Sequence, residues 1–121
     1  MKKPPFHKSV LFTLRGIIWI LRNERNFQFH ILGLIINLFL IVFFGLSNIE
    51  TALIIFCCFF VLVTEALNTC VEKICDHIQP EFDQRIGIIK DLAGGAVLLS
   101  VIVSICVGTL VYWPYLKLFL Y

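Results

Sequence analysis

The sequence predicts an all-α membrane protein in which one amphipathic surface helix precedes three transmembrane helices. Three observations predict this fold. Of the 121 residues, 60% are apolar and only 15% are charged, which is more apolar surface than a soluble domain of this length can bury. Three long apolar segments are separated by short polar ones, and the N-terminal segment carries basic residues on one side. By length, residues 1–121 form a single domain.

Residues 6–25 are predicted to form a helix that lies on the membrane surface. Lys8, Arg15 and Arg22 recur every seven residues. Apolar residues recur at helical spacing on a different side, namely Val10, Leu14, Ile17, Ile18 and Leu21. An apolar face opposite a basic face is typical of a helix at the boundary between lipid and water. Trp19 is expected to anchor the helix there.

Transmembrane helices are predicted at residues 27–47, 50–77 and 86–113. Each range holds the roughly 20 residues that cross a hydrocarbon core about 30 Å thick. Pro80 is expected to stop the second helix and Pro114 to end the third. Asn37, the strongly polar residue inside the first span, is predicted to make a hydrogen bond to another helix. The Ala93–Ala96 cluster, which contains two glycines, is predicted to let another helix approach closely.

The positions of the basic residues predict the orientation in the membrane. One group precedes the first span, and a second group lies between the second and third spans: Lys2, Lys3, Lys8, Arg15, Arg22 and Arg25, then Lys73, Arg85 and Lys90. The link at residues 47–51 holds Glu50 and no Lys or Arg. By the positive-inside rule, the N-terminus and residues 73–90 are cytoplasmic, whereas the link and the C-terminus face outward.

A stripe of polar residues follows the cytoplasmic end of the second span. Each helical residue turns the chain by about 100°, so Glu65, Asn68, Glu72 and Asp76 share a stripe roughly 80° wide and about 16 Å long. A carboxylate at bilayer depth costs on the order of 2.5–3.5 kcal/mol on insertion scales and is a candidate functional group by default. The stripe is therefore expected to face a partner, an ion or a water-filled pocket.

The cytoplasmic ends of the three spans combine to suggest a chemistry. Glu24 precedes the first span, the acidic stripe ends the second, and Lys90 and Asp91 begin the third. Neighbouring carboxylates favour a divalent cation such as Mg²⁺, which is usually held by one or two carboxylates together with substrate phosphates. Lys90 can pair with phosphate oxygens, and a carboxylate within the membrane can take a proton from a lipid hydroxyl. The set suits phosphoryl transfer from a nucleotide to an alcohol in the bilayer.

Other features limit the alternatives. The net charge of +2 is too small to indicate a nucleic-acid partner. The sequence has no P-loop and no kinase-type glycine-rich loop, and the spacing of its five cysteines fits no zinc site. His7, His30 and His77 are expected at the membrane interface without a catalytic role.

Three motifs carry a family resemblance. Glu65-x-Leu67-Asn68-Thr69-x-Val71-Glu72-x-x-x-Asp76 closely resembles the signature of the small bacterial integral-membrane diacylglycerol kinase family, which includes undecaprenol kinases. Lys90-Asp91, followed by small residues and Val97–Leu99, is similar to the second motif of that family. Asn23–Phe27, with His30 after it, is similar to the N-terminal motif in the form common in the undecaprenol-kinase branch. The resemblance covers roughly residues 6–110.

The resemblance implies an ATP- and Mg²⁺-dependent lipid kinase. Such an enzyme transfers the γ-phosphate of ATP to the primary hydroxyl of a membrane lipid alcohol, either undecaprenol or diacylglycerol. It also implies a homotrimer in the bacterial inner (cytoplasmic) membrane, with active sites shared between subunits. By matching position, Glu65 is the general base, Glu24 and Glu72 are the Mg²⁺ ligands, and the lipid contacts Glu65, Asn68 and Gly94. The residues expected to bind ATP are Glu24, Glu72, Asp76, Glu81, Phe82, Asp83, Lys90 and Asp91.

The chain departs from the family pattern at several positions, namely Gln28, Cys70, Cys75, Asp83 and Ile88. The two cysteines are tolerable in volume, whereas the other three differences affect the expected adenine and ribose contacts. Two other functions stay open. One is a small cation or proton channel subunit with Glu65 and Glu72 in its pore, although residues 52–63 offer no polar lining along the rest of the membrane depth. The other is a non-catalytic membrane accessory protein.

Overall fold

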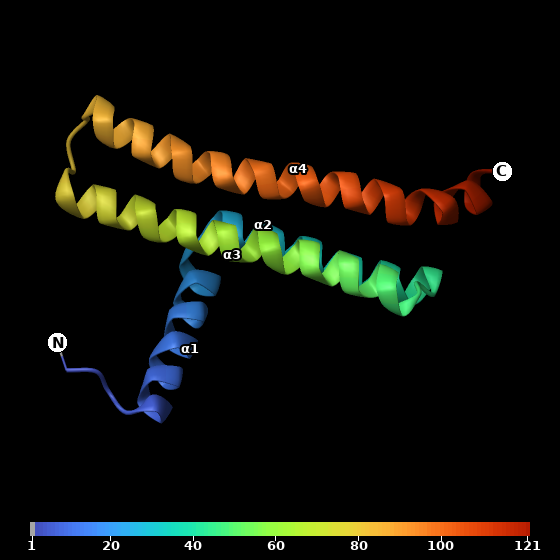
Figure 1. The fold of residues 1–121 in the computed structure, drawn as a ribbon, viewed down its shortest axis with the longest axis horizontal. Coiled ribbons are helices and arrows are strands. Elements are labelled where there is room, and N and C mark those ends of the chain that lie inside the picture. Colours follow the sequence, from blue (N-terminus) through green and yellow to red (C-terminus); the bar gives the residue numbers. More distant parts are fainter. Residues whose placement is uncertain (1) are drawn as a thin grey trace.

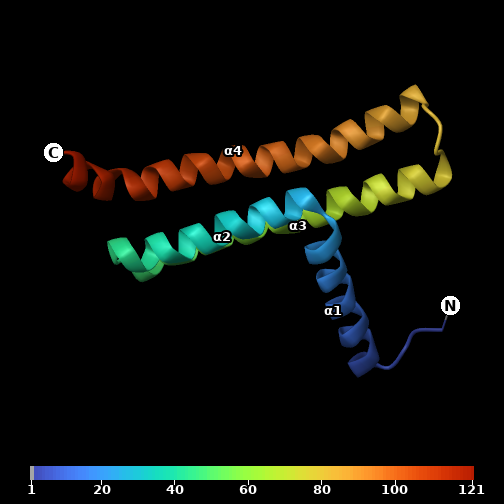
Figure 2. The same ribbon diagram turned by 180° about the vertical axis from the view of Figure 1, so that it is seen from behind.

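The computed structural model describes residues 2–121, and it is entirely helical in its regular structure. The helices are α1 (Phe6–Asn23), α2 (Arg25–Phe44), α3 (Asn48–Ile78) and α4 (Gln84–Leu120). α3 packs against both α2 and α4, and these three lie side by side, whereas α1 projects steeply away from them (Figure 1). The view from behind shows α1 and the α3–α4 loop toward one end of the bundle, and the α2–α3 link and the C-terminus at the other (Figure 2). The predicted all-α class is confirmed.

α2, α3 and α4 are each long and apolar enough to cross a membrane. Their 20, 31 and 37 residues correspond to lengths of about 30, 46 and 55 Å. Many of their large apolar side chains point outward, including Phe39, Phe56 and Leu98. Such a surface requires lipid or other protein as its surroundings. The apolar side chains of α1 are about half exposed, and its position on the membrane surface stays a prediction.

The corner between α1 and α2 lies at Glu24, so α1 ends earlier than the predicted residue 25. Glu24 is extended, with φ −106° and ψ 113°, and this one residue lets the two helices point in different directions. α2 begins at Arg25 and ends at Phe44, three residues before the predicted residue 47. Gly45 closes α2 at φ +64°, a left-handed conformation that glycine adopts without a steric penalty.

α3 begins with a reciprocal cap. The backbone amide of Glu50 donates to the Ser47 hydroxyl over 3.2 Å, and the Ser47 amide donates to Glu50 Oε1 over 3.0 Å. This capping box satisfies two donors that the first turn of a helix leaves free. It starts α3 at Asn48, two residues before the predicted start.

The predicted end of α4 at Trp113 is wrong. The helix continues through Pro114 to Leu120. A proline inside a helix costs about 3 kcal/mol. Contacts at the end of α4 offset this cost. The Tyr115 hydroxyl donates to Glu50 over 2.6 Å, a charge-assisted hydrogen bond that joins α4 beyond Pro114 to the start of α3. The Phe119 ring lies 5.7 Å from that of Phe43 and 6.0 Å from that of Phe44, and each such pair adds about 0.5–1.5 kcal/mol.

Hydrogen bonds between helices set the register of the bundle. Tyr112 donates to Asn37 Oδ1 over 2.8 Å, which confirms the predicted interhelical contact of Asn37. Ser100 is completely buried, and its hydroxyl lies 2.9 Å from that of Thr64. The close approach predicted at Gly94 and its neighbour is wrong within one subunit, because a Cβ atom there would meet nothing within 4 Å.

Candidate active site

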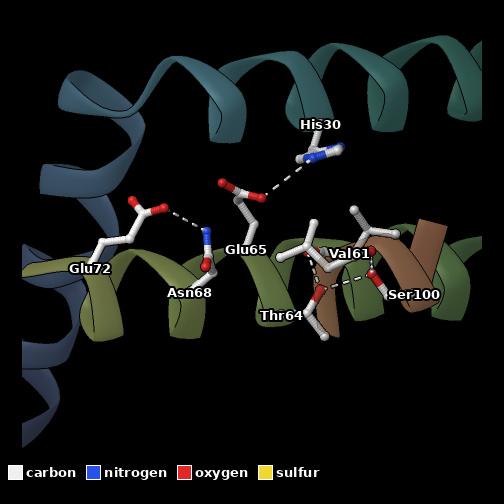
Figure 3. Close-up of polar contacts among 8 residues, drawn as sticks. His30, Val61, Thr64, Glu65, Asn68, Glu72 and Ser100 are labelled. Carbon is white, nitrogen blue, oxygen red and sulfur yellow. Dashed lines mark hydrogen bonds and ion pairs between the residues drawn. The ribbon is translucent and has the colours of Figure 1, made fainter. Parts of the chain in front are cut away.

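Glu65, Asn68 and Glu72 lie on one face of α3 and point toward α2, as their spacing predicted (Figure 3). The Asn68 amide donates to Glu72 Oε1 over 3.3 Å. Glu65 is 4% exposed and Asn68 is 8% exposed, so both are buried within a single subunit. The acidic stripe therefore begins inside the bundle at Glu65 and Asn68 and reaches the surface at Asp76.

Residues on both sides of the α1–α2 corner pack against α3 near Glu65. Ile20 from α1 and Phe27 from α2 pack with Leu62 of α3 as one buried cluster, and Ala66 packs against it. Leu62 lies three residues before Glu65 and Ala66 directly after it, so this apolar cluster packs on α3 next to the carboxylate. Burial of apolar surface at about 25 cal/mol per Å² is the main force that holds the corner in place.

His30 on α2 faces the buried carboxylate. Its Nε2 atom lies 3.7 Å from Glu65 Oε2, an ion pair when the imidazole is protonated (Figure 3). His30 was expected at the membrane interface without a catalytic role, and its contact with Glu65 was not predicted. A signal was present, because His30 and Asn37 are seven residues apart and therefore share one face of an otherwise apolar helix.

Glu24 reaches the same region from the α1–α2 corner. Its carboxylate lies 3.7 Å from Lys73 Nζ, and the Lys73 ammonium also lies 5.2 Å from the centre of the Trp19 ring. Glu24 and Glu72 are both close enough to Glu65 to interact with it electrostatically. The fold thus gathers three carboxylates from two separate segments, as the sequence analysis expected, and adds Lys73, which it did not assign.

The number of oxygen donors that lie close together decides whether this region suits a magnesium ion. Within residues 2–121, no three His, Cys, Asp or Glu side chains come close enough to hold a metal by themselves. Mg²⁺ needs fewer protein ligands than that, since phosphates and water complete its octahedron. Asn68 Oδ1 is buried and has no hydrogen-bond partner, so an acceptor beside Glu72 is left for a ligand. Glu24 and Glu72 are the residues that could hold the ion.

A second cluster lies where α3 meets α4. Lys90 of α4 forms an ion pair with Asp76 of α3. Both residues line a hollow of about 150 Å³ together with the α3–α4 loop and the first turn of α4, namely Gln79, Pro80, Glu81, Phe82, Asp83, Ile86 and Gly87. The structure therefore brings together five of the residues expected to bind ATP. Asp91 and Gly94 lie on α4 outside this hollow.

Asp83 also has a structural task. Its side chain accepts a hydrogen bond from the Arg85 amide over 2.8 Å and caps the start of α4. The Arg85 side chain lies 3.3 Å from Asp83 Oδ2. This contact, together with the backbone bond, holds the pKa of the Asp83 carboxyl below its ordinary value. Asp83 was predicted to bind ATP, and its role as the N-terminal cap of α4 was not predicted.

Comparison with known proteins identifies relatives of this chain. A family model described as prokaryotic diacylglycerol kinase matches residues 11–112. The chain is 34% identical over 109 residues to the undecaprenol kinase of Bacillus subtilis (strain 168), a match that covers 90% of this chain and 89% of that protein. It is 26% identical over 110 residues to the diacylglycerol kinase of Escherichia coli (strain K12), covering 89% and 88%.

Proposed function

The chain belongs to the prokaryotic diacylglycerol kinase family, and from this premise we propose that it transfers the γ-phosphate of ATP to the primary hydroxyl of undecaprenol. The observation that carries the proposal is Glu65, a carboxylate buried on an apolar helix beside His30, Asn68 and Glu72. A membrane-embedded carboxylate in such a setting is typical of a functional site. Undecaprenol is preferred to diacylglycerol because the undecaprenol kinase relative is the more similar of the two.

Glu65 acts as the general base in this proposal. Its carboxylate takes the proton of the lipid hydroxyl, the freed oxygen attacks the γ-phosphorus, and the bond from that phosphorus to the β–γ bridging oxygen breaks to release ADP. Positioned proton transfer of this kind typically contributes 10²–10⁴-fold to the rate. His30 holds the carboxylate facing α2, and the adjacent Ile20–Phe27–Leu62 cluster excludes water.

The nucleotide is proposed to lie along the cytoplasmic part of α3. Asp76, Lys90 and the loop at Glu81–Asp83 line the hollow at the far end, and Glu72 lies one helical turn closer to Glu65. Glu24 and Glu72 would hold Mg²⁺, which when bound neutralises charge that develops on the phosphates. Lys90 would exchange its contact with Asp76 for a phosphate oxygen, since it pairs with phosphate as a compact charge.

Assembly and location belong to the same proposal. The outward-facing apolar side chains of α2, α3 and α4 support a membrane location and leave surface for neighbouring subunits, whereas the homotrimer and the bacterial inner membrane rest on the family resemblance. The basic residues near α1 and the α3–α4 loop support a cytoplasmic position for that end of the bundle. Shared active sites would place the exposed side of the acidic cluster against a neighbouring subunit.

A phosphorylation assay tests the proposal. Purified protein in detergent receives radiolabelled ATP, Mg²⁺ and either undecaprenol or diacylglycerol, and labelled lipid is counted. We expect faster labelling of undecaprenol, loss of activity on removal of Mg²⁺, and a loss of about 10²–10⁴-fold in Glu65→Gln. Helix content and assembly size, measured for the same variant, should be unchanged. Full activity in a well-assembled Glu65→Gln protein would refute the assignment, and ion flux in liposomes without ATP would favour a channel instead.

A further inference from the structure

We propose that Lys73 is a positioning residue, which holds the Glu24 carboxylate at the candidate magnesium site. This inference rests on the proposed function, in which Glu24 and Glu72 hold the ion. Lys73 lies on α3 directly after Glu72, and its Nζ atom lies 3.7 Å from Glu24 Oε1. The contact therefore joins the α1–α2 corner to the helix that carries the other proposed metal ligand.

The side chain of Glu24 is turned away from its own helix. Glu24 stands at the N-cap position of α2, yet its side chain accepts no hydrogen bond from the first turn of that helix. An anionic side chain is ordinarily stabilised there by the free backbone amides and by the helix dipole. The carboxylate extends to Lys73 on α3 instead. The direction of the Glu24 side chain thus depends on Lys73.

The ring of Trp19 holds Lys73 in turn. The ammonium lies 5.2 Å from the centre of this ring on α1, a distance at which a cation is attracted to an aromatic face. The Lys73 side chain is 59% exposed, and a long exposed side chain without partners would sample many rotamers. The ring and the carboxylate together restrict it. Arg25, the basic residue next to Glu24, lies against the Phe29 ring instead.

The charge of Lys73 also keeps Glu24 near the other acids. Glu24 and Glu72 both interact electrostatically with Glu65, and like charges favour a conformation that separates them. Lys73 offsets this repulsion at Glu24. Because its ammonium faces Oε1, Oε2 is left for the ion. A ligand that is already held in place loses less conformational freedom when the ion binds.

The backbone of the α1–α2 corner is held without Lys73. The Gln28 side-chain amide donates to the Leu21 carbonyl over 3.0 Å, and the Glu24 backbone amide donates to the Ile20 carbonyl over 3.0 Å. Ile20 is also buried in the apolar cluster on α3. The variant Lys73→Met should therefore keep the corner and release only the Glu24 side chain.

The first experiment measures nucleotide binding by calorimetry, without turnover. The probe is an ATP analogue with a methylene group in place of the β–γ bridging oxygen, titrated into the detergent-solubilised protein with Mg²⁺ or with EDTA. With Mg²⁺, we expect Kd to rise about tenfold or more in Lys73→Met, since loss of a residue that orients a metal ligand typically costs 10–100-fold. Lys73→Arg, which keeps the charge, should recover most of the affinity. With EDTA, Lys73→Met and the wild type should bind equally.

Lys117→Met is the matched control. Lys117 lies 5.8 Å from the centre of the Trp113 ring, and among residues 2–121 it pairs with no Asp or Glu. Its Kd should match that of the wild type under both conditions. Helix content and assembly size should be the same in all variants.

Three results would overturn the proposal. Equal Kd values for the wild type and Lys73→Met with Mg²⁺ would show that Lys73 has no part in binding. Equal losses with Mg²⁺ and with EDTA would show that Lys73 contacts the nucleotide itself. Tighter binding in Lys73→Met would show that Lys73 obstructs the metal ligand. A wild-type protein that does not bind the analogue would refute the proposed function, and this inference with it.

The second experiment tests whether Lys73 acts through Glu24. Glu24→Gln should weaken Mg²⁺-dependent binding, and adding Lys73→Met to it should weaken binding no further, because both changes remove the same carboxylate contact. Trp19→Leu should raise Kd about two- to fivefold, as for the loss of an exposed cation–π contact. Additive losses in the double variant would overturn the proposal even if each single variant behaves as expected.

Discussion

The Nε2 atom of His30 lies 3.7 Å from Glu65 Oε2, so a residue at the start of α2 faces the buried carboxylate in the middle of α3. This relationship connects the fold to the proposed chemistry. Glu65 needs a partner because an isolated charge at this depth is unfavourable. His30 supplies one from a different helix, and it also lines an apolar pocket between α2, α3 and α4.

Replacing His30 should reduce turnover. In His30→Ala, Glu65 stays buried but loses the imidazole that lies 3.7 Å from its carboxylate, and we expect kcat to fall about tenfold or more because the buried charge is left without a partner. His30→Gln keeps a donor and should recover part of the rate. The measurement is kcat at saturating ATP and lipid. A wild-type kcat in His30→Ala would show that the contact has no part in catalysis.

Replacing Lys90 should raise the KM for ATP and leave the thermal stability of the protein almost unchanged. The Lys90 and Asp76 side chains are 37% and 60% exposed, and an ion pair as exposed as this contributes little to stability. In Lys90→Met, we therefore expect a small change in Tm but a rise of about tenfold or more in the KM for ATP, because a charge-assisted contact with phosphate is lost. Lys117→Met, at the opposite end of α4, is the control. A large drop in Tm with an unchanged KM would contradict the assignment.

The stability of the bundle should depend strongly on the size of the side chain at position 100 and much less on the hydroxyl of Ser100. It is completely buried between α3 and α4. Hydrogen bonds between membrane helices average about 0.6 kcal/mol, whereas overpacking a filled site costs about 1–3 kcal/mol. Ser100→Ala should thus lower the free energy of unfolding much less than Ser100→Leu does, as measured by circular dichroism during titration with a denaturing detergent. Thr109→Leu, at an exposed position of α4, should resemble the wild type. Equal losses in both Ser100 variants would be inconsistent with tight packing there.

Acidic pH should loosen the first turn of α4. The pKa of Asp83 lies below its ordinary value of 3.8 because of its bonds to the Arg85 side chain and amide. A carboxyl with a lowered pKa stabilises the folded state above its unfolded pKa, and this contribution is lost as the pH falls through the folded pKa. We expect the amide protection factors at Arg85 and Gly87 to fall in that acidic range. Asp83→Asn, whose amide oxygen can still cap the helix, should remove this pH dependence.

Much of the site could be predicted from the sequence because it depends on spacing along one helix. Glu65, Asn68 and Glu72 fall on one face by helical periodicity, and the structure places them so. The interhelical role of Asn37 followed from its isolation in an apolar span. His30 was missed because its role depends on which residue of α3 lies opposite it. Periodicity within one helix does not determine how far that helix is shifted along its neighbour.

The sequence by itself determined the membrane class, the approximate helix positions and the polar face of α3, since each of these follows from the local order of apolar and polar residues. Only the tertiary structure decided which side chains meet between segments: His30 with Glu65, Glu24 with Lys73, and Lys90 with Asp76. It also decided that α4 continues beyond Pro114. These features depend on the bend at Glu24 and on the register of antiparallel helices. Both are set by the sum of many weak packing contacts between distant segments, which no local pattern contains.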